Sequence, residues 1–260
     1  LLSLTGAVPV FEANANPTTM QHFRVEGSVN EACGTIYPAG SLEQGGMPLG
    51  AISTGYLCVD TDGRFGKASI FNRFPTPIQL NQPFLTVTFG GKEYVVAADK
   101  DGLGDAKAIH YFGHYPVLDA RFEFDAPFRI ELRAYAPFLP GDAVESNTPA
   151  AIFEVTVVNL SGENQAIAVT FSPRGFPAGA SEPFSTGAWS GMQVTHAPLE
   201  SMPDWIKGTY VVAAENGRVD SSTAETRVSV DSTVNANGQA AASFVLSWHE
   251  PYLRDGSGRA

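Results

Sequence analysis

Residues 151–172 read AIFEVTVVNLSGENQAIAVTFS, with an apolar–polar alternation on each side of the turn sequence NLSGEN. Alternation with a period of two is typical of a β-strand with one buried and one solvated face. The Ser-Gly pair near the middle is typical of a hairpin tip. The stretch therefore predicts two antiparallel strands joined as a long hairpin.

The same pattern recurs along the chain, between turn sequences rich in Gly, Asn and Pro. Further strands are predicted at residues 84–89, 93–97, 121–124, 128–135, 208–213, 225–230 and 240–248. Helical periodicity is nearly absent, and short strands spaced in this way favour a sandwich. The sequence predicts an all-β fold: one large antiparallel β-sandwich domain of two sheets over residues 31–260, after an N-terminal segment at residues 1–30.

The first fifteen residues contain a signal-like pattern. The apolar run LLSLTGAV is followed by Ala13-Asn14-Ala15, as at the end of a secretion signal. We interpret it as a signal remnant and expect a secreted or periplasmic protein; the alternative is an ordinary first strand and a cytoplasmic protein. No apolar run approaches the ~20 residues that cross a bilayer, so we expect no transmembrane segment.

Charge and cysteine content narrow the classes of partner. The formal net charge is −11, and the sixteen Lys and Arg residues are scattered, which argues against nucleic acid as a partner. Cys33 and Cys58 form no CxxC pair, so we expect no metal or redox site on cysteine, and we expect no cofactor. Cys58 lies in an apolar run and is expected to be a buried thiol. The sequence leaves open whether the two cysteines pair.

Residues 42–74 are rich in glycine, and their short apolar runs alternate with turn residues. Glycine marks positions where the backbone takes a positive φ or passes close to another surface. We interpret this density as a sign that this edge of the fold packs against something else.

Several segments, taken in order, carry a resemblance to a known family. They are GMPLGAISTG (46–55), GRF (63–65), IFN (70–72), YFGHYP (111–116), AYAPFLPGD (134–142), SNTPAAIF (146–153) and FVLSWH (244–249). Together they resemble the N-terminal domain of glycoside hydrolase family 116, the family of non-lysosomal glucosylceramidases and related β-glucosidases.

The resemblance implies a β-sandwich that precedes a catalytic (α/α)6 barrel, and retaining hydrolysis of β-glucosides by a Glu and an Asp of that barrel. No carboxylate of this chain corresponds to either residue, so we expect the barrel to lie outside this chain and the segment to be inactive alone. The expected partner is the barrel domain of the same protein, which binds the carbohydrate substrate. The residues expected at the domain interface are Met47, Pro48, Leu49, Gly50, Gly55, Phe65, Phe71 and Asn72.

A second function class stays open, a free-standing carbohydrate-binding or adhesin-like module. Trp189 and Trp205 occur in polar, loop-like surroundings and are the candidate sugar contacts. Trp248 follows the apolar alternation of the last strand and is expected in the core.

The paired aspartates have a structural interpretation. Asp60 with Asp62, and Asp99 with Asp101, are expected to shape exposed turns, because Asp favours such turns. An EF-hand is excluded because His110 occupies the position of its last Glu. A looser calcium site near Asp99 stays open.

Two histidines lie four residues apart. The neighbouring Gly113 and Pro116 argue against a helix, and in an extended chain His110 and His114 lie about 13 Å apart on one face. We therefore expect structural or interface histidines and not a shared metal site.

Overall fold

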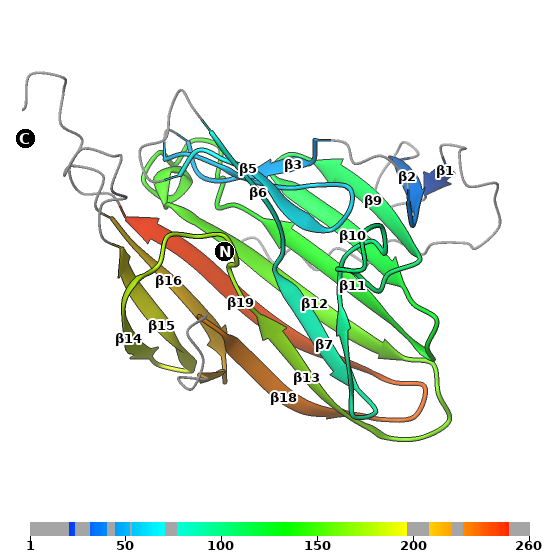
Figure 1. Cartoon of the computed structure of the whole chain (residues 1–260). Helices are drawn as coiled ribbons and strands as arrows, with labels where there is room; N and C mark the ends of the chain where they lie inside the picture. The colour runs from blue at the N-terminus through cyan, green and yellow to red at the C-terminus, as the bar shows by residue number, and fades with distance from the viewer. Residues whose placement is uncertain are drawn as a thin grey trace, which may run out of the picture.

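In the computed structural model, the described residues are 21–23, 32–40, 45–52, 54–70, 77–196, 208–219 and 226–249 (Figure 1). They form nineteen strands in three antiparallel sheets and one short 3₁₀ turn, η1 (Glu145–Asn147). None of these residues is in an α-helix, and so none is in a helix that could span a membrane. The predicted all-β fold is confirmed.

The largest sheet has ten strands in the order β1–β2–β9–β10–β11–β12–β19–β16–β15–β14. Their bounds are β1 (Gln21–Phe23), β2 (Ala32–Pro38), β9 (Ala108–His114), β10 (Val117–Glu123), β11 (Phe128–Tyr135), β12 (Ala150–Asn159), β19 (Gln239–His249), β16 (Gly208–Glu215), β15 (Trp189–His196) and β14 (Gly179–Thr186).

Two smaller sheets complete the fold. The five-stranded sheet contains β17 (Arg218–Val219), β18 (Val228–Val234), β13 (Gln165–Phe171), β7 (Leu85–Phe89) and β8 (Lys92–Val95). The four-stranded sheet contains β3 (Met47–Leu49), β4 (Leu57–Val59), β5 (Arg64–Ala68) and β6 (Ile78–Pro83).

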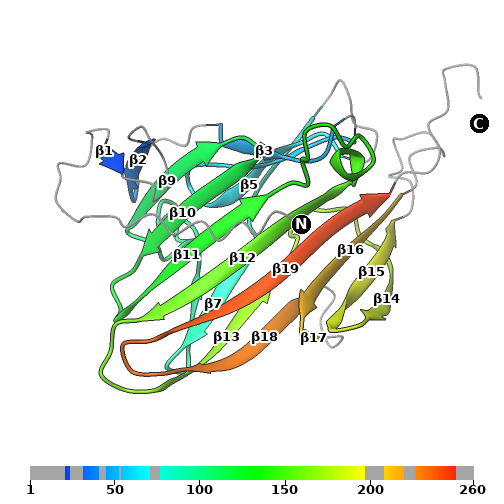
Figure 2. The ribbon, with the colours of Figure 1, turned by 180° about the vertical axis from the view of Figure 1, so that it is seen from behind.

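The two smaller sheets cover different parts of one face of the ten-stranded sheet (Figures 1 and 2). β3, β5 and β6 cover its upper part in Figure 1, and β7, β13 and β18 cover its lower part. β6 continues into β7 with only Phe84 between them, so the four-stranded sheet leads directly into the first strand of the five-stranded sheet. The expected two-layer sandwich is therefore present, but its second layer is divided into two sheets.

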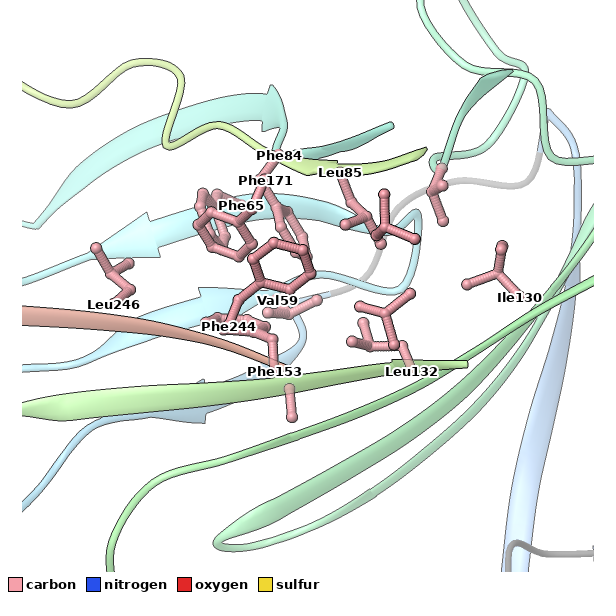
Figure 3. Close-up of a cluster of buried hydrophobic side chains, with 14 of the residues drawn as sticks. Val59, Phe65, Phe84, Leu85, Ile130, Leu132, Phe153, Phe171, Phe244 and Leu246 are labelled. Carbon is pink, nitrogen blue, oxygen red and sulfur yellow. The ribbon is translucent and has the colours of Figure 1, made fainter. Parts of the chain in front are cut away.

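Strand alternation builds the core between these layers. In β11, Phe128, Ile130, Leu132 and Ala134 are buried, and the residues between them are partly exposed. At the centre, phenylalanines from five segments meet (Figure 3). Phe65 and Phe84 stack with ring centroids 4.0 Å apart, and Phe153, Phe171 and Phe244 surround them. Because strands of all three sheets contribute rings to it, the cluster joins the sheets. Aromatic rings bury large apolar areas, so their contribution to the core is large.

The predicted hairpin over residues 151–172 is wrong. β12 pairs with β11 and β19 in the ten-stranded sheet, whereas β13 pairs with β7 and β18 in the opposite layer. The turn between the two strands therefore crosses from one layer to the other. Asn159, at the end of β12, fixes this crossing: its side-chain amide donates hydrogen bonds to the carbonyls of Glu163 and Asn235.

Candidate docking surface

Five of the seven segments of the family resemblance reach one end of the sandwich; Phe65 of the segment 63–65 lies in the core, and residues 71 and 72 lie outside the described residues. We define the motif end as residues 46–55, 111–117 and 136–149 together with the end of β19. The far end consists of the turns at residues 124–127, 160–164 and 235–238. The far end is at the lower right of Figure 1, and the last residues of β19 point to the upper left, near η1.

The loop at residues 50–55 contacts two distant segments. The Ile52 N–H donates to the carbonyl of Ser146 at 2.9 Å. The indole Nε1–H of Trp248 donates to the carbonyl of Thr54 at 2.7 Å, across 194 residues of sequence. Trp248 is buried, as expected. The loop is therefore fixed from both sides by segments that are far away in the chain.

Tyr111 of β9 joins the four-stranded sheet to the large one. Its hydroxyl accepts a hydrogen bond from the Met47 N–H at 2.7 Å and donates one to the Val59 carbonyl at 2.6 Å. Burial raises the pKa of the Tyr111 phenol, so the group stays protonated and can donate. The sequence contained this tyrosine in the YFGHYP segment, but nothing in the pattern indicated its role.

Ser146 organises the segment between β11 and β12. Its Oγ accepts from the Leu139 N–H and donates to the Leu139 carbonyl, both at 2.9 Å. The Ser146 side chain is buried, and its own carbonyl binds Ile52. The 50–55 loop and the 136–149 segment thus form one connected unit.

The glycines of this region are explained by contacts within the chain. A Cβ at Gly46 would overlap the Val59 carbonyl, and one at Gly50 would overlap the Gly55 carbonyl. Gly55 has a φ of +85° and its Cβ would lie 2.8 Å from the Ser69 carbonyl oxygen. The interpretation that glycine density marks a neighbour is therefore wrong, because the backbone of this chain itself passes close to these glycines.

Exposed apolar side chains, by contrast, do gather at the motif end. Seven large apolar side chains are exposed among the described residues, and five of them lie here. These five define the apolar loop cluster: Ile52, Tyr115, Phe138, Leu139 and Val144, the last 81% exposed. The rings of Tyr115 and Phe138 contact each other, with centroids 5.7 Å apart. A gathered set of exposed apolar side chains, unlike single scattered ones, makes this surface the candidate docking surface.

The predicted interface residues are divided between surface and core. Pro48 is exposed and Met47 is half-buried at the motif end. Leu49 and Phe65 are 0% exposed, so they are core residues and cannot contact a neighbouring domain. Gly50 and Gly55 shape the loop that carries Ile52. Phe71 and Asn72 lie outside the described residues.

The two candidate sugar contacts have different outcomes. Trp189 is half-buried and is the first residue of β15, where it pairs with Thr186 of β14 and Glu215 of β16. It therefore belongs to a strand and not to a loop. Trp205 lies outside the described residues, as does the signal-like N-terminus.

The aspartates form ion pairs beside the four-stranded sheet. Arg64 binds both carboxylate oxygens of Asp101, at 2.8 and 2.6 Å, and this hydrogen bonding lowers the pKa of Asp101 to about 2. Asp62 contacts Lys100 at 2.6 Å. Asp60 and Asp62 do form a turn, but both are buried, so the expected exposed turn is wrong for them.

The other residues considered as metal ligands, Asp99, His110 and His114, also contact charged side chains of this chain. Asp99 pairs with Lys107 at 2.6 Å. In the extended strand β9, His110 faces Glu123 at 3.1 Å and His114 faces Asp119 at 3.4 Å. Each of these carboxylates also binds an arginine, Arg121 at Glu123 and Arg133 at Asp119, so each histidine is part of a local charged network. Within the described ranges, no group of three His, Cys, Asp or Glu side chains could hold a metal ion.

Cys58 is a free thiol in β4 and is half-buried. Burial raises the pKa of this thiol to about 11, and the neighbouring Asp60 adds to the shift. The thiol is therefore protonated at neutral pH and a weak nucleophile.

The region that builds this surface matches a known protein family. Residues 46–215 match the family model described as beta-glucosidase 2, glycosyl-hydrolase family 116 N-term. The chain belongs to this family. The matched range begins at Gly46 of the motif end and runs to the end of β16, so it covers most of the described fold. The resemblance inferred from the sequence is confirmed.

A search of curated proteins gave no match. Among solved structures, a protein described as a kojibiose phosphorylase from the human microbiome is similar, with 9% identity and a TM-score of 0.37 over 88% of this chain and 28% of that one. A polysaccharide lyase shows 10% identity and a TM-score of 0.35 over 81% of this chain and 32% of that one. The chain spans less than a third of either protein, and at these scores neither likeness bears on its function.

Proposed function

We propose that this chain is the non-catalytic N-terminal β-sandwich of a glycoside hydrolase that acts on β-glucosides, as glucosylceramidases do. In this proposal the motif end packs against the catalytic (α/α)6 domain of the same protein and frames its active site. The observation that carries the proposal is the apolar loop cluster, which is formed by the same segments that carry the family match.

The path of the chain supports this orientation. Trp248 and His249 complete β19 at the motif end, beside the loop that presents Ile52. The described part of the chain therefore leaves β19 on the side of the apolar loop cluster, which favours a later domain on that side.

Charge around the apolar loop cluster indicates the chemistry of the facing surface. Glu145 is exposed beside Val144, and Asp142 is partly exposed nearby, so the rim on this side is acidic. We expect the facing surface to be apolar in its centre and to carry Lys or Arg at its rim, because complementary charges at a rim orient partners.

The chemistry of the reaction is assigned to the catalytic domain. A retaining glycosidase needs two carboxyl groups about 5–5.5 Å apart, one as nucleophile and one as acid. In the proposed protein both belong to the barrel, and we expect the sandwich to need no cofactor. We also propose, from the signal-like N-terminus alone, that the protein is secreted or periplasmic.

The test is a set of substitutions in the full-length polypeptide that carries this chain. The triple variant Ile52→Asp, Leu139→Asp and Val144→Asp introduces charge into the apolar loop cluster. The matched control, Leu103→Asp with Leu160→Asp, changes apolar residues that are similarly exposed, 55% and 51%, but lie elsewhere. We expect calorimetry to show one coupled unfolding transition in the wild type and the control, and two separate transitions in the triple variant.

Two results would overturn the proposal. One is identical unfolding of the triple variant and the control. The other is hydrolysis of an aryl β-glucoside by the isolated chain. Binding of a glucan by the isolated chain, lost on Trp189→Ala, would instead support the carbohydrate-binding module.

A further inference from the structure

Three segments at the motif end are joined in a circuit of hydrogen bonds. The Ile52 N–H binds the carbonyl of Ser146, three residues before Pro149. The Trp248 backbone N–H binds the Pro149 carbonyl at 3.0 Å, and its indole N–H binds the Thr54 carbonyl at 2.7 Å. Ile52 and Thr54 belong to the same loop, so these bonds link the three segments to one another.

Trp248 occupies a special place in this circuit, because one residue contacts two of the segments. Its backbone holds the start of β12 and its side chain holds the loop that carries Ile52. The ring is buried, so water competes little for the indole N–H, and a hydrogen bond is worth more in such a setting.

The described residues of the loop also have local support, since β3 and β4 pair on either side of it and Ala51 is buried. Its internal bonds join Thr54 to Ala51, through the Thr54 N–H and Oγ1 at 3.3 and 3.2 Å. Gly50 and Gly55, both at positive φ, bound the loop and leave its backbone conformationally free in the unfolded state. The bonds to Ser146 and Trp248 add long-range contacts at Ile52 and Thr54, the two described residues on the outer part of the loop.

We propose that Trp248 is a positioning residue, which holds the 50–55 loop in the conformation in which Ile52 faces outward. Trp248 makes these hydrogen bonds in the isolated chain. Their contribution to docking rests on the proposed function. A loop that is ordered before binding loses less conformational entropy on binding, so the hydrogen bonds of Trp248 strengthen association with a neighbouring domain.

The test is Trp248→Phe, which keeps an aromatic ring in the core and removes the donor. We expect amide hydrogen exchange at Ile52 and Thr54 to become about 5-fold faster, the factor that corresponds to one net hydrogen bond. The matched control is Tyr210→Phe, on the cross-strand neighbour of Trp248, which removes the bond from the Tyr210 hydroxyl to the Pro177 carbonyl. We expect no change at Ile52 and Thr54 in the control.

Unchanged exchange at Ile52 and Thr54 in a folded Trp248→Phe variant, or equal acceleration in the control, would overturn the proposal. If the variant does not fold, the wild-type chain supplies the measurement. The indole N–H of Trp248 should exchange at least about 10-fold more slowly than that of the half-buried Trp189. Equal rates for the two indoles would overturn the proposal as well.

The outcomes separate this proposal from the proposed function. If Trp248→Phe loosens the loop while the triple Asp variant keeps coupled unfolding, the positioning role stands and the docking role fails. If the triple variant uncouples the domains while Trp248→Phe leaves the loop unchanged, docking stands and the positioning role fails.

Discussion

The turns and loops at the two ends of the sandwich are fixed by different kinds of contact. At the far end, the turns between strands are closed by polar contacts, and Asn159 is the centre of them, with bonds to Glu163, Ser161 and Asn235. At the motif end, backbone contacts fix the loops from beneath, while Ile52, Leu139 and Val144 remain exposed. Among the described residues of the far end, Leu160 is the one large apolar side chain that is exposed, whereas five such side chains gather at the motif end, as suits a surface that meets a partner.

This contrast separates residues that build the motif end from residues that it presents. Tyr111, Ser146 and Trp248 are buried and bind backbone groups of other segments. Substitutions in the buried set should affect the isolated chain, and substitutions in the exposed set should affect only the chain with its neighbour. The following predictions test this distinction.

The largest effect is expected for Phe65→Ala. Phe65 is fully buried and stacks on Phe84, so its removal leaves a cavity where the three sheets meet. The free energy of unfolding of the isolated chain should fall by about 3–5 kcal/mol, measured by urea denaturation. Ile52→Asp, at an exposed site, should change it by less than about 0.5 kcal/mol. Equal effects would contradict the division into core and surface.

A smaller but clear loss is expected for Asn159→Ala at the far end. The variant leaves the carbonyls of Glu163 and Asn235 without their amide donor and should lose about 1–3 kcal/mol of unfolding free energy. The control is Asn164→Ala, which removes one exposed bond to the Ala236 N–H and should cost less than about 1 kcal/mol. Similar losses in both variants, by thermal unfolding, would show that Asn159 does not organise the far end.

Gly55→Ala should destabilise the motif end by about 1–3 kcal/mol. The new Cβ would clash with the Ser69 carbonyl, and the alanine would have to adopt a φ near +85°. Gly91→Ala is the control, since Gly91 has a similar φ of +81° with open space around it, and should show the smaller cost of strain alone. A larger loss in the control than in Gly55→Ala would rule out the backbone contact as the reason for this glycine.

The smallest effect concerns acid. The bonds from Arg64 lower the pKa of Asp101 to about 2 from an ordinary value near 4. A lowered folded-state pKa stabilises the fold above the ordinary value, and this contribution is lost as the pH falls from about 4 to about 2. Asp101→Asn should therefore destabilise the chain at pH 6 and have less effect at pH 2, in urea titrations at both values. A loss that is larger at pH 2 would contradict the assignment.

The sequence predicted the strands better than their partners. The bounds of β11 and β13 agree with the alternation of the sequence, because burial on one face determines that pattern. The hairpin over residues 151–172 was wrong because alternation reports which side chains face inward and not which strand lies beside them. Pairing depends on contacts far along the chain, such as those of β12 with β19.

The candidate surface was predicted in part and for an incorrect reason. The glycine-rich stretch does lie at the motif end, but its glycines serve contacts within the chain. Leu49 and Phe65 were expected at the surface, since a motif does not report burial. The exposure of Val144 depends on tertiary structure, as does the hydrogen bond between Trp248 and Thr54, which are far apart in the sequence. No local pattern predicts either feature.

The most direct test of the central claim is a comparison of amide hydrogen exchange between the isolated chain and the full-length polypeptide that carries it. We predict slower exchange in the full-length protein at residues 50–55, 114–117 and 136–149, and equal exchange at residues 124–127, 160–164 and 235–238. Equal exchange at the motif end in both proteins, or new protection confined to the far end, would contradict the claim that the apolar loop cluster meets a neighbouring domain.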